Sequence, residues 1–119
     1  MLVVDGMWHF CGWARSVLTR AGYDVLEAKT PSAAREIVER ERGQIDCVVC
    51  EVNFRDRTDG PILMVSLWKM DDALKVIFVS GYDRSTCKLE VGDEFLQKPF
   101  RPRELVALVR EMISRRERM

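Results

Sequence analysis

Short strand-like segments alternate with amphipathic helical segments along this chain, and this order constrains the fold more than any other feature. Segments rich in β-forming residues cover residues 2–4, 23–28, 45–52, 73–79 and 94–97. The third of them is apolar almost throughout after Asp46, as expected for a strand that helices cover on both faces. Apolar residues recur at helical spacing in segments that start near residues 9, 31, 61 and 102.

Strands that alternate with helices require parallel pairing and right-handed crossovers. We therefore predict a single α/β domain over residues 1–119, a doubly wound three-layer sandwich with helices on both faces of the sheet. The flavodoxin-like strand order 2-1-3-4-5 is the commonest solution for five such units. Residues 83–92 leave room for little more than two turns of helix, so we expect the fourth helix to be short or irregular.

Composition excludes several classes of protein. Nineteen basic residues balance nineteen acidic ones, which argues against binding to nucleic acid or to an anionic membrane surface. The chain has no apolar run long enough to span a membrane, and its four cysteines do not suggest a disulfide scaffold, so we expect a cytoplasmic protein. Cys47 and Cys50 fall in a predicted strand and point to opposite faces, which favours core thiols over half of a zinc site.

Four polar residues follow four different predicted strands. Asp5, Glu51, Ser80 and Lys98 each fall at the carboxyl end of a strand. In open α/β sheets the binding crevice lies beyond these ends, where the strand order switches. The sequence therefore predicts one site that holds two carboxylates, a hydroxyl and an ammonium group.

The segments around these four residues resemble the receiver domains of bacterial response regulators. The resemblance extends over essentially the whole chain. Its motifs are Leu2-Val3-Val4-Asp5, the strand 46–51 followed by Asp59-Gly60, Ser80-Gly81-Tyr82, and Phe95-Leu96-Gln97-Lys98-Pro99-Phe100. The last run, ahead of an amphipathic helix, is the most specific of them.

The resemblance implies a role for each matching position. Receivers take a phosphoryl group from a histidine kinase onto an aspartate, with magnesium held by that aspartate and an acidic pair. Carried over, the roles are first acid of the pair (Asp5), phosphate acceptor (Glu51), third metal contact through a backbone carbonyl (Asn53), switch hydroxyl (Ser80), aromatic that rotates on activation (Phe95) and phosphate-pairing cation (Lys98).

Two positions depart from the family pattern. Gly6 replaces the second acid, and Glu51 replaces the acceptor aspartate. Losing a carboxylate should weaken magnesium at Asp5, Glu51 and Asn53 markedly. The extra methylene of Glu51 moves its carboxylate by roughly 1.5 Å, and an error near 1 Å can reduce a positioned reaction on the order of a hundredfold. We therefore expect no cofactor, and Mg²⁺ only in a domain that does accept phosphate.

The sequence thus favours a degenerate receiver that is not an enzyme and binds a protein partner without phosphorylation. The partner would be a histidine kinase or an output domain, and the resemblance also leaves room for a homodimer. We hypothesise a Glu51–Lys98 ion pair, with a Ser80 hydrogen bond, that holds one state; alternatively, Glu51 only preserves a polar rim.

Two other classes of function are weaker candidates. A functional phospho-acceptor receiver, modified by a histidine kinase, remains the alternative. A nucleotide- or flavin-binding enzyme would need a phosphate-binding loop after the first strand. Residues 5–8, Asp-Gly-Met-Trp, offer no glycine-rich loop of that kind.

Overall fold

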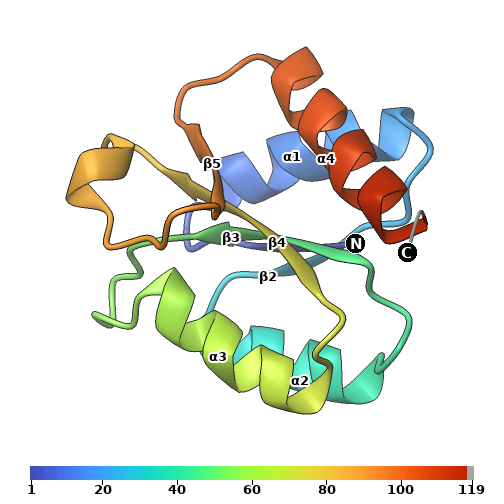
Figure 1. Ribbon diagram of the computed structural model, residues 1–119, viewed down its shortest axis with the longest axis horizontal. Helices are drawn as coiled ribbons and strands as arrows, with labels where there is room; N and C mark the ends of the chain where they lie inside the picture. The colour runs from blue at the N-terminus through green and yellow to red at the C-terminus, as the bar shows by residue number, and fades with distance from the viewer. Residues whose placement is uncertain (118–119) are drawn as a thin grey trace.

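Five parallel strands form the centre of the molecule. The computed structural model describes residues 1–117, and its single sheet has the order β2-β1-β3-β4-β5 (Figure 1). The strands are β1 (Leu2–Val4), β2 (Leu26–Ala28), β3 (Cys47–Glu51), β4 (Lys75–Ser80) and β5 (Glu94–Gln97). This order confirms the predicted flavodoxin-like topology.

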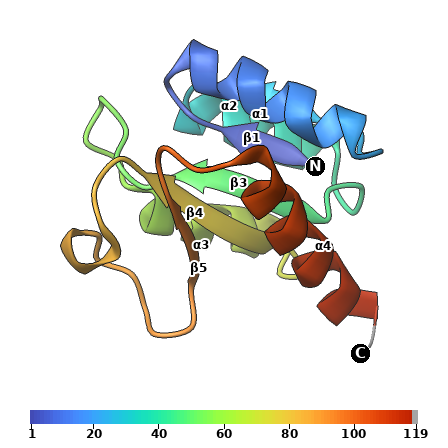
Figure 2. The same cartoon turned by 90° about the horizontal axis from the view of Figure 1, so that it is seen from above.

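Within the described residues, four α-helices cover the two faces of this sheet. They are α1 (Trp8–Arg20), α2 (Pro31–Arg40), α3 (Gly60–Met70) and α4 (Pro102–Glu117). Helices α1 and α4 lie together on one face, and α2 and α3 on the other, so the molecule has three layers (Figures 1 and 2). None of the helices within residues 1–117 combines the length and the apolar character that crossing a bilayer requires.

The core consists of two apolar clusters, one on each face of the sheet. Cys50 belongs to the cluster that contains Leu63 of α3, and Cys47 to the cluster that contains Leu105 of α4. Both thiols are fully buried, and burial raises the pKa of Cys47 to about 12. The prediction that these cysteines are core residues on opposite faces is confirmed.

Helices α2 and α3 begin where the sequence carries start signals. Thr30 Oγ1 accepts a hydrogen bond from the Ala33 N–H at 3.0 Å, and Pro31 occupies the first helical position. At α3, Asp59 Oδ1 accepts from the Ile62 N–H at 2.8 Å. A Cβ at Gly60 would overlap the backbone oxygen of Glu51, so only glycine lets α3 start this close to the end of β3.

Three strands are shorter than their sequence patterns predict. β2 begins at Leu26 and not at residue 23, β3 covers Cys47–Glu51 and not residues 45–52, and β4 covers Lys75–Ser80 and not residues 73–79. The neighbouring strand β1 explains the first difference, because it has only three residues and pairs only with Leu26–Ala28. Tyr23 and Val25 therefore pack against the core outside the β-ladder.

The connection between β4 and β5 holds a short 3₁₀ turn in place of a fourth full helix. Within the described residues 81–93, the helical element is η1 (Arg84–Thr86), capped by the Asp83 side chain. The Arg84 guanidinium closes this loop, because it donates to the backbone carbonyls of Glu90 and Asp93. The prediction of a short or irregular fourth helix is confirmed.

Candidate functional site

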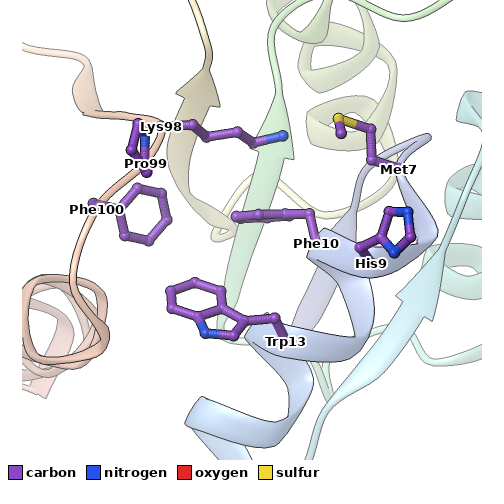
Figure 3. Close-up of a pocket in the computed structure, with 7 residues that line it drawn as sticks. All are labelled: Met7, His9, Phe10, Trp13, Lys98, Pro99 and Phe100. Atoms are coloured by element: carbon purple, nitrogen blue, oxygen red, sulfur yellow. The ribbon is translucent and has the colours of Figure 1, made fainter.

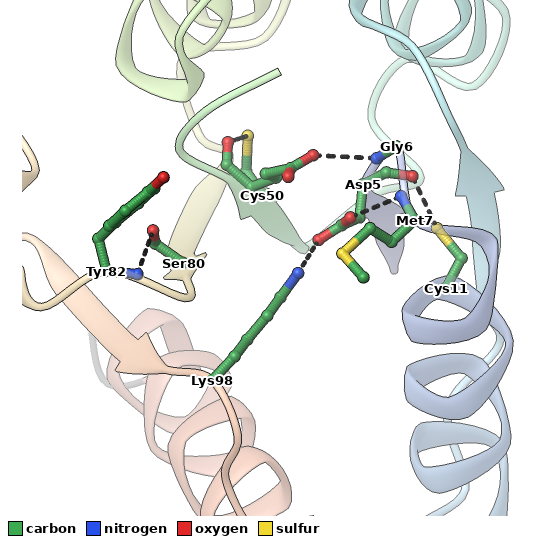
Figure 4. A network of polar contacts seen from close by, with 9 residues as sticks. Asp5, Gly6, Met7, Cys11, Cys50, Ser80, Tyr82 and Lys98 are labelled. Carbon is green, nitrogen blue, oxygen red and sulfur yellow. Dashed lines mark hydrogen bonds and ion pairs between the residues drawn. The ribbon is translucent and has the colours of Figure 1, made fainter. Parts of the chain in front are cut away.

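The carboxyl ends of β1, β3, β4 and β5 bring the four predicted polar residues to one rim. Figure 4 shows three of them, Asp5, Ser80 and Lys98. The ladder register places Glu51 beside Val79, next to Ser80, while Val4 pairs with Cys50 and so sets Asp5 beside Glu51. A cavity of about 570 Å³ opens here. Its lining residues are Met7, Glu51, Asn53, Ser80, Gly81, Tyr82, Lys98 and Pro99.

Asp5 lies at the base of the rim and is fully buried. Its Oδ2 accepts from the Lys98 ammonium at 2.7 Å, and its Oδ1 accepts from the Met7 N–H at 2.9 Å. Both carboxylate oxygens therefore have a partner. A buried carboxylate with a charged partner and a backbone donor avoids the large cost of an uncompensated buried charge.

Glu51 directs its carboxylate to the opposite side, toward Gly6. Its Oε2 accepts from the Gly6 N–H at 3.0 Å, and a Cβ at Gly6 would lie 3.7 Å from that oxygen. The carboxylate thus lies beside the side-chain position that glycine leaves empty. Burial raises the pKa of Glu51; the Gly6 N–H opposes this rise, and the charge of Asp5 adds to it.

The expected Glu51–Lys98 ion pair with a Ser80 hydrogen bond is wrong. Lys98 pairs with Asp5, and the Ser80 hydroxyl accepts from the Tyr82 N–H at 3.1 Å. The physical reason is burial. The Asp5 side chain is 0% exposed, so its charge needs a counter-ion. The Glu51 side chain is half-buried and accepts a hydrogen bond from a backbone N–H. The backbone N–H of Lys98 donates to the Ser80 carbonyl at 2.7 Å, which holds the backbone of residue 98 beside the end of β4. From there the Lys98 side chain extends across the rim to Asp5.

The donor set in this arrangement does not fit Mg²⁺. Magnesium requires an octahedron of oxygens supplied in part by carboxylates. Here both oxygens of Asp5 are engaged, one oxygen of Glu51 is engaged, and Gly6 has no side chain to offer. Within the described residues, no three His, Cys, Asp or Glu side chains come together in a way that could hold a metal ion.

The other polar and aromatic residues that the sequence places near the site have local packing or hydrogen-bond partners. Phe95 on β5 is half-buried against the cluster on the α2 and α3 face. Asn53 is exposed at the mouth of the cavity, and its backbone forms an isolated antiparallel β-bridge with that of Asp59. Asp56 accepts from the Thr58 N–H at 2.9 Å in a turn, and Asp59 caps α3, so both acids have local structural roles.

One residue near the site was not found from the sequence. The Lys98 ammonium lies 4.1 Å from the centroid of the Phe10 ring. Phe10 also lines an apolar pocket of about 410 Å³ beside the rim (Figure 3). The lining residues are Met7, His9, Phe10, Trp13, Lys98, Pro99 and Phe100. An available signal was the aromatic pair at positions 10 and 13 of α1, three residues apart on the helix and directly after the acidic strand end.

Comparison with known sequences agrees with this geometry. The family model described as response regulator receiver domain matches residues 1–110. Sensor kinase CckA of Brucella abortus is 36% identical over 110 residues, which is 89% of this chain and 11% of the relative. Aerobic respiration control protein ArcA of Escherichia coli is 30% identical over 85% of this chain and 42% of its own length. The chain therefore spans less than half of either relative.

Solved structures give the same result. The receiver domain of the hybrid histidine kinase CckA superimposes with a TM-score of 0.81 and 31% identity, covering 93% of this chain and 95% of that one. A CheY-like receiver from Methanospirillum hungatei has a TM-score of 0.85 at 24% identity, over 98% of this chain and 94% of that one, and shows the shared fold. This chain therefore belongs to the response regulator receiver domains, the two-component signalling modules that interact with histidine kinases or output domains.

Proposed function

We propose that this receiver domain is a protein-interaction module that works without phosphorylation of residue 51, and that it is not an enzyme acting on itself. One observation carries the proposal: the Lys98 ammonium, which would pair with a phosphoryl group, is bound to Asp5. In addition, the Glu51 carboxylate accepts a hydrogen bond from Gly6. The two groups that phosphoryl transfer would use are therefore both engaged elsewhere.

The electrostatics of the rim support the same conclusion. Phosphoryl transfer depends on positioning and on cations that neutralise the charge of the transferred group. Asp5 and Glu51 are engaged in the contacts already described, and position 6 contributes no carboxylate. We propose that the domain uses no metal cofactor and that its partner is a kinase or an output domain.

The test exposes the protein to acetyl phosphate and to beryllofluoride, each with Mg²⁺. We expect no gain in intact mass, and no change in the amide NMR signals of Ser80, Phe95 and Lys98. The double variant Gly6→Asp/Glu51→Asp is the positive control, because it restores the family's carboxylates. A phosphoryl adduct on the wild-type chain that disappears in Glu51→Gln would contradict the proposal and establish a functional phospho-acceptor.

A further inference from the structure

The Lys98 ammonium has two partners, a carboxylate and an aromatic ring. Asp5 Oδ2 is 2.7 Å from Nζ, and the Phe10 ring centroid is 4.1 Å from it. The Lys98 side chain is only 17% exposed, so little water competes for these contacts. A cation over an aromatic face is stabilised by roughly 0.5–1 kcal/mol when exposed and by about 2 kcal/mol when desolvated.

The orientation of the Phe10 ring is itself fixed by other aromatic rings. Phe100 meets Phe10 edge to face at a centroid distance of 5.9 Å, and Trp13 lies 5.9 Å from Phe10 and 5.5 Å from Phe100. Phe100 follows Lys98 by two residues. The turn after β5 therefore supplies both the ammonium and one of the rings that hold its aromatic partner, and the three rings lie together in Figure 3.

We infer that Phe10 is a positioning residue for Lys98: its ring holds the ammonium on Asp5, so that the side chain of Lys98 serves as the resident cation of the acidic rim. This inference rests on the proposed function and deepens it. A cation that belongs to the chain itself needs no metal to neutralise Asp5. While it is paired with Asp5, it is also not free to pair with a phosphoryl group.

The first test is an NMR measurement on the protein without any phosphate donor. The face of the Phe10 ring should shift the ε-methylene protons of Lys98 upfield. Phe10→Leu keeps the apolar volume but removes the ring, so the signals should move toward those of an ordinary lysine. Phe10→Tyr keeps the ring and should retain the wild-type shift. An ordinary lysine shift in the wild-type chain would overturn the inference even if Phe10→Leu fails to fold.

The second test measures competition for Asp5 with Mn²⁺ alone, followed by the electron paramagnetic resonance signal of free Mn²⁺. Phe10→Leu should bind Mn²⁺ about three- to thirtyfold more tightly than the wild-type chain, the range expected for the loss of one cation–π contact. Phe10→Tyr should stay within about twofold of wild type. Equal affinities for the wild type and Phe10→Leu, or equal gains in both variants, would overturn the inference.

The two proposals fail in different ways. Phosphorylation of the wild-type chain by acetyl phosphate removes the proposed function but leaves the lysine shifts and the Mn²⁺ comparison to report on Phe10. Conversely, unchanged lysine shifts in Phe10→Leu remove the role of Phe10, while an absence of phosphorylation still supports the proposed function.

Discussion

At the scale of single residues, Gly6 and Glu51 are complementary in size and in hydrogen bonding. The longer side chain of Glu51 reaches the Gly6 N–H, and the missing side chain of Gly6 leaves room for the carboxylate. Because both residues contribute to the same contact, the Glu51 carboxylate lies toward Gly6, at the end of β1. The two residues therefore form one structural unit at the rim.

The raised pKa of Glu51 predicts how stability depends on pH. A carboxyl group whose folded pKa lies above its unfolded value binds its proton more tightly in the folded state. Its ionisation therefore removes stability as the pH rises from the unfolded pKa, near 4.5, through the folded one. Glu51→Gln cannot ionise, so its stability relative to wild type should increase between pH 4 and pH 7.

Urea denaturation at several pH values measures this difference. Glu36→Gln on the exposed surface of α2 is the control for the loss of one negative charge. The assignment would be wrong if the two glutamine variants followed the same pH dependence.

At the scale of elements, predictability depended on whether the determining contact is local. Thr30-Pro31 and Asp59-Gly60 are local start signals, and the helices start there. The start of β2 depends on the length of its neighbour β1, which the residues of β2 do not contain. The partner of Lys98 could not be predicted from local sequence either. Two carboxylates at the same rim compete for the ammonium, and their burial decides which one binds it.

The contact between α3 and β3 gives a prediction with an internal control. Gly60→Ala forces its Cβ against the backbone of β3, so we expect a loss of about 1–3 kcal/mol in the free energy of unfolding. Gly12→Ala lies inside α1, where nothing approaches the new Cβ within 4 Å. That variant should gain roughly 0.5–1 kcal/mol, the usual difference between alanine and glycine in a helix.

Urea denaturation measures both glycine variants. Equal effects of the two substitutions would show that the close approach of Gly60 to β3 is not a constraint on the fold.

At the scale of the whole molecule, the sequence order of strands and helices was enough to predict the sheet topology and the rim at which the polar residues meet. The pairing within that rim was not predictable, since it depends on how deeply each of the two carboxylates is buried. Lys98 and Asp5 are 93 residues apart, and their contact connects the turn after the edge strand β5 to the end of β1. At the rim, this contact therefore joins β5 to β1 past the ends of β4 and β3.

That sequence separation has a kinetic consequence. A contact between residues far apart in sequence costs loop-closure entropy before it contributes stability. We therefore expect the Lys98–Asp5 contact to form after the transition state. Lys98→Met leaves Asp5 buried and unpaired, at a cost of about 3–5 kcal/mol. A contact absent from the transition state affects mainly the unfolding rate, which should rise on the order of a hundredfold or more in stopped-flow experiments, with refolding nearly unchanged.

The exposed variant Lys88→Met is the control and should leave both rates close to wild type. Slower refolding of Lys98→Met would instead place the contact early in folding. If the expected rates are found, the ion pair at the rim also determines how long each molecule stays folded before it opens, and thus its lifetime against proteases that cleave opened chains.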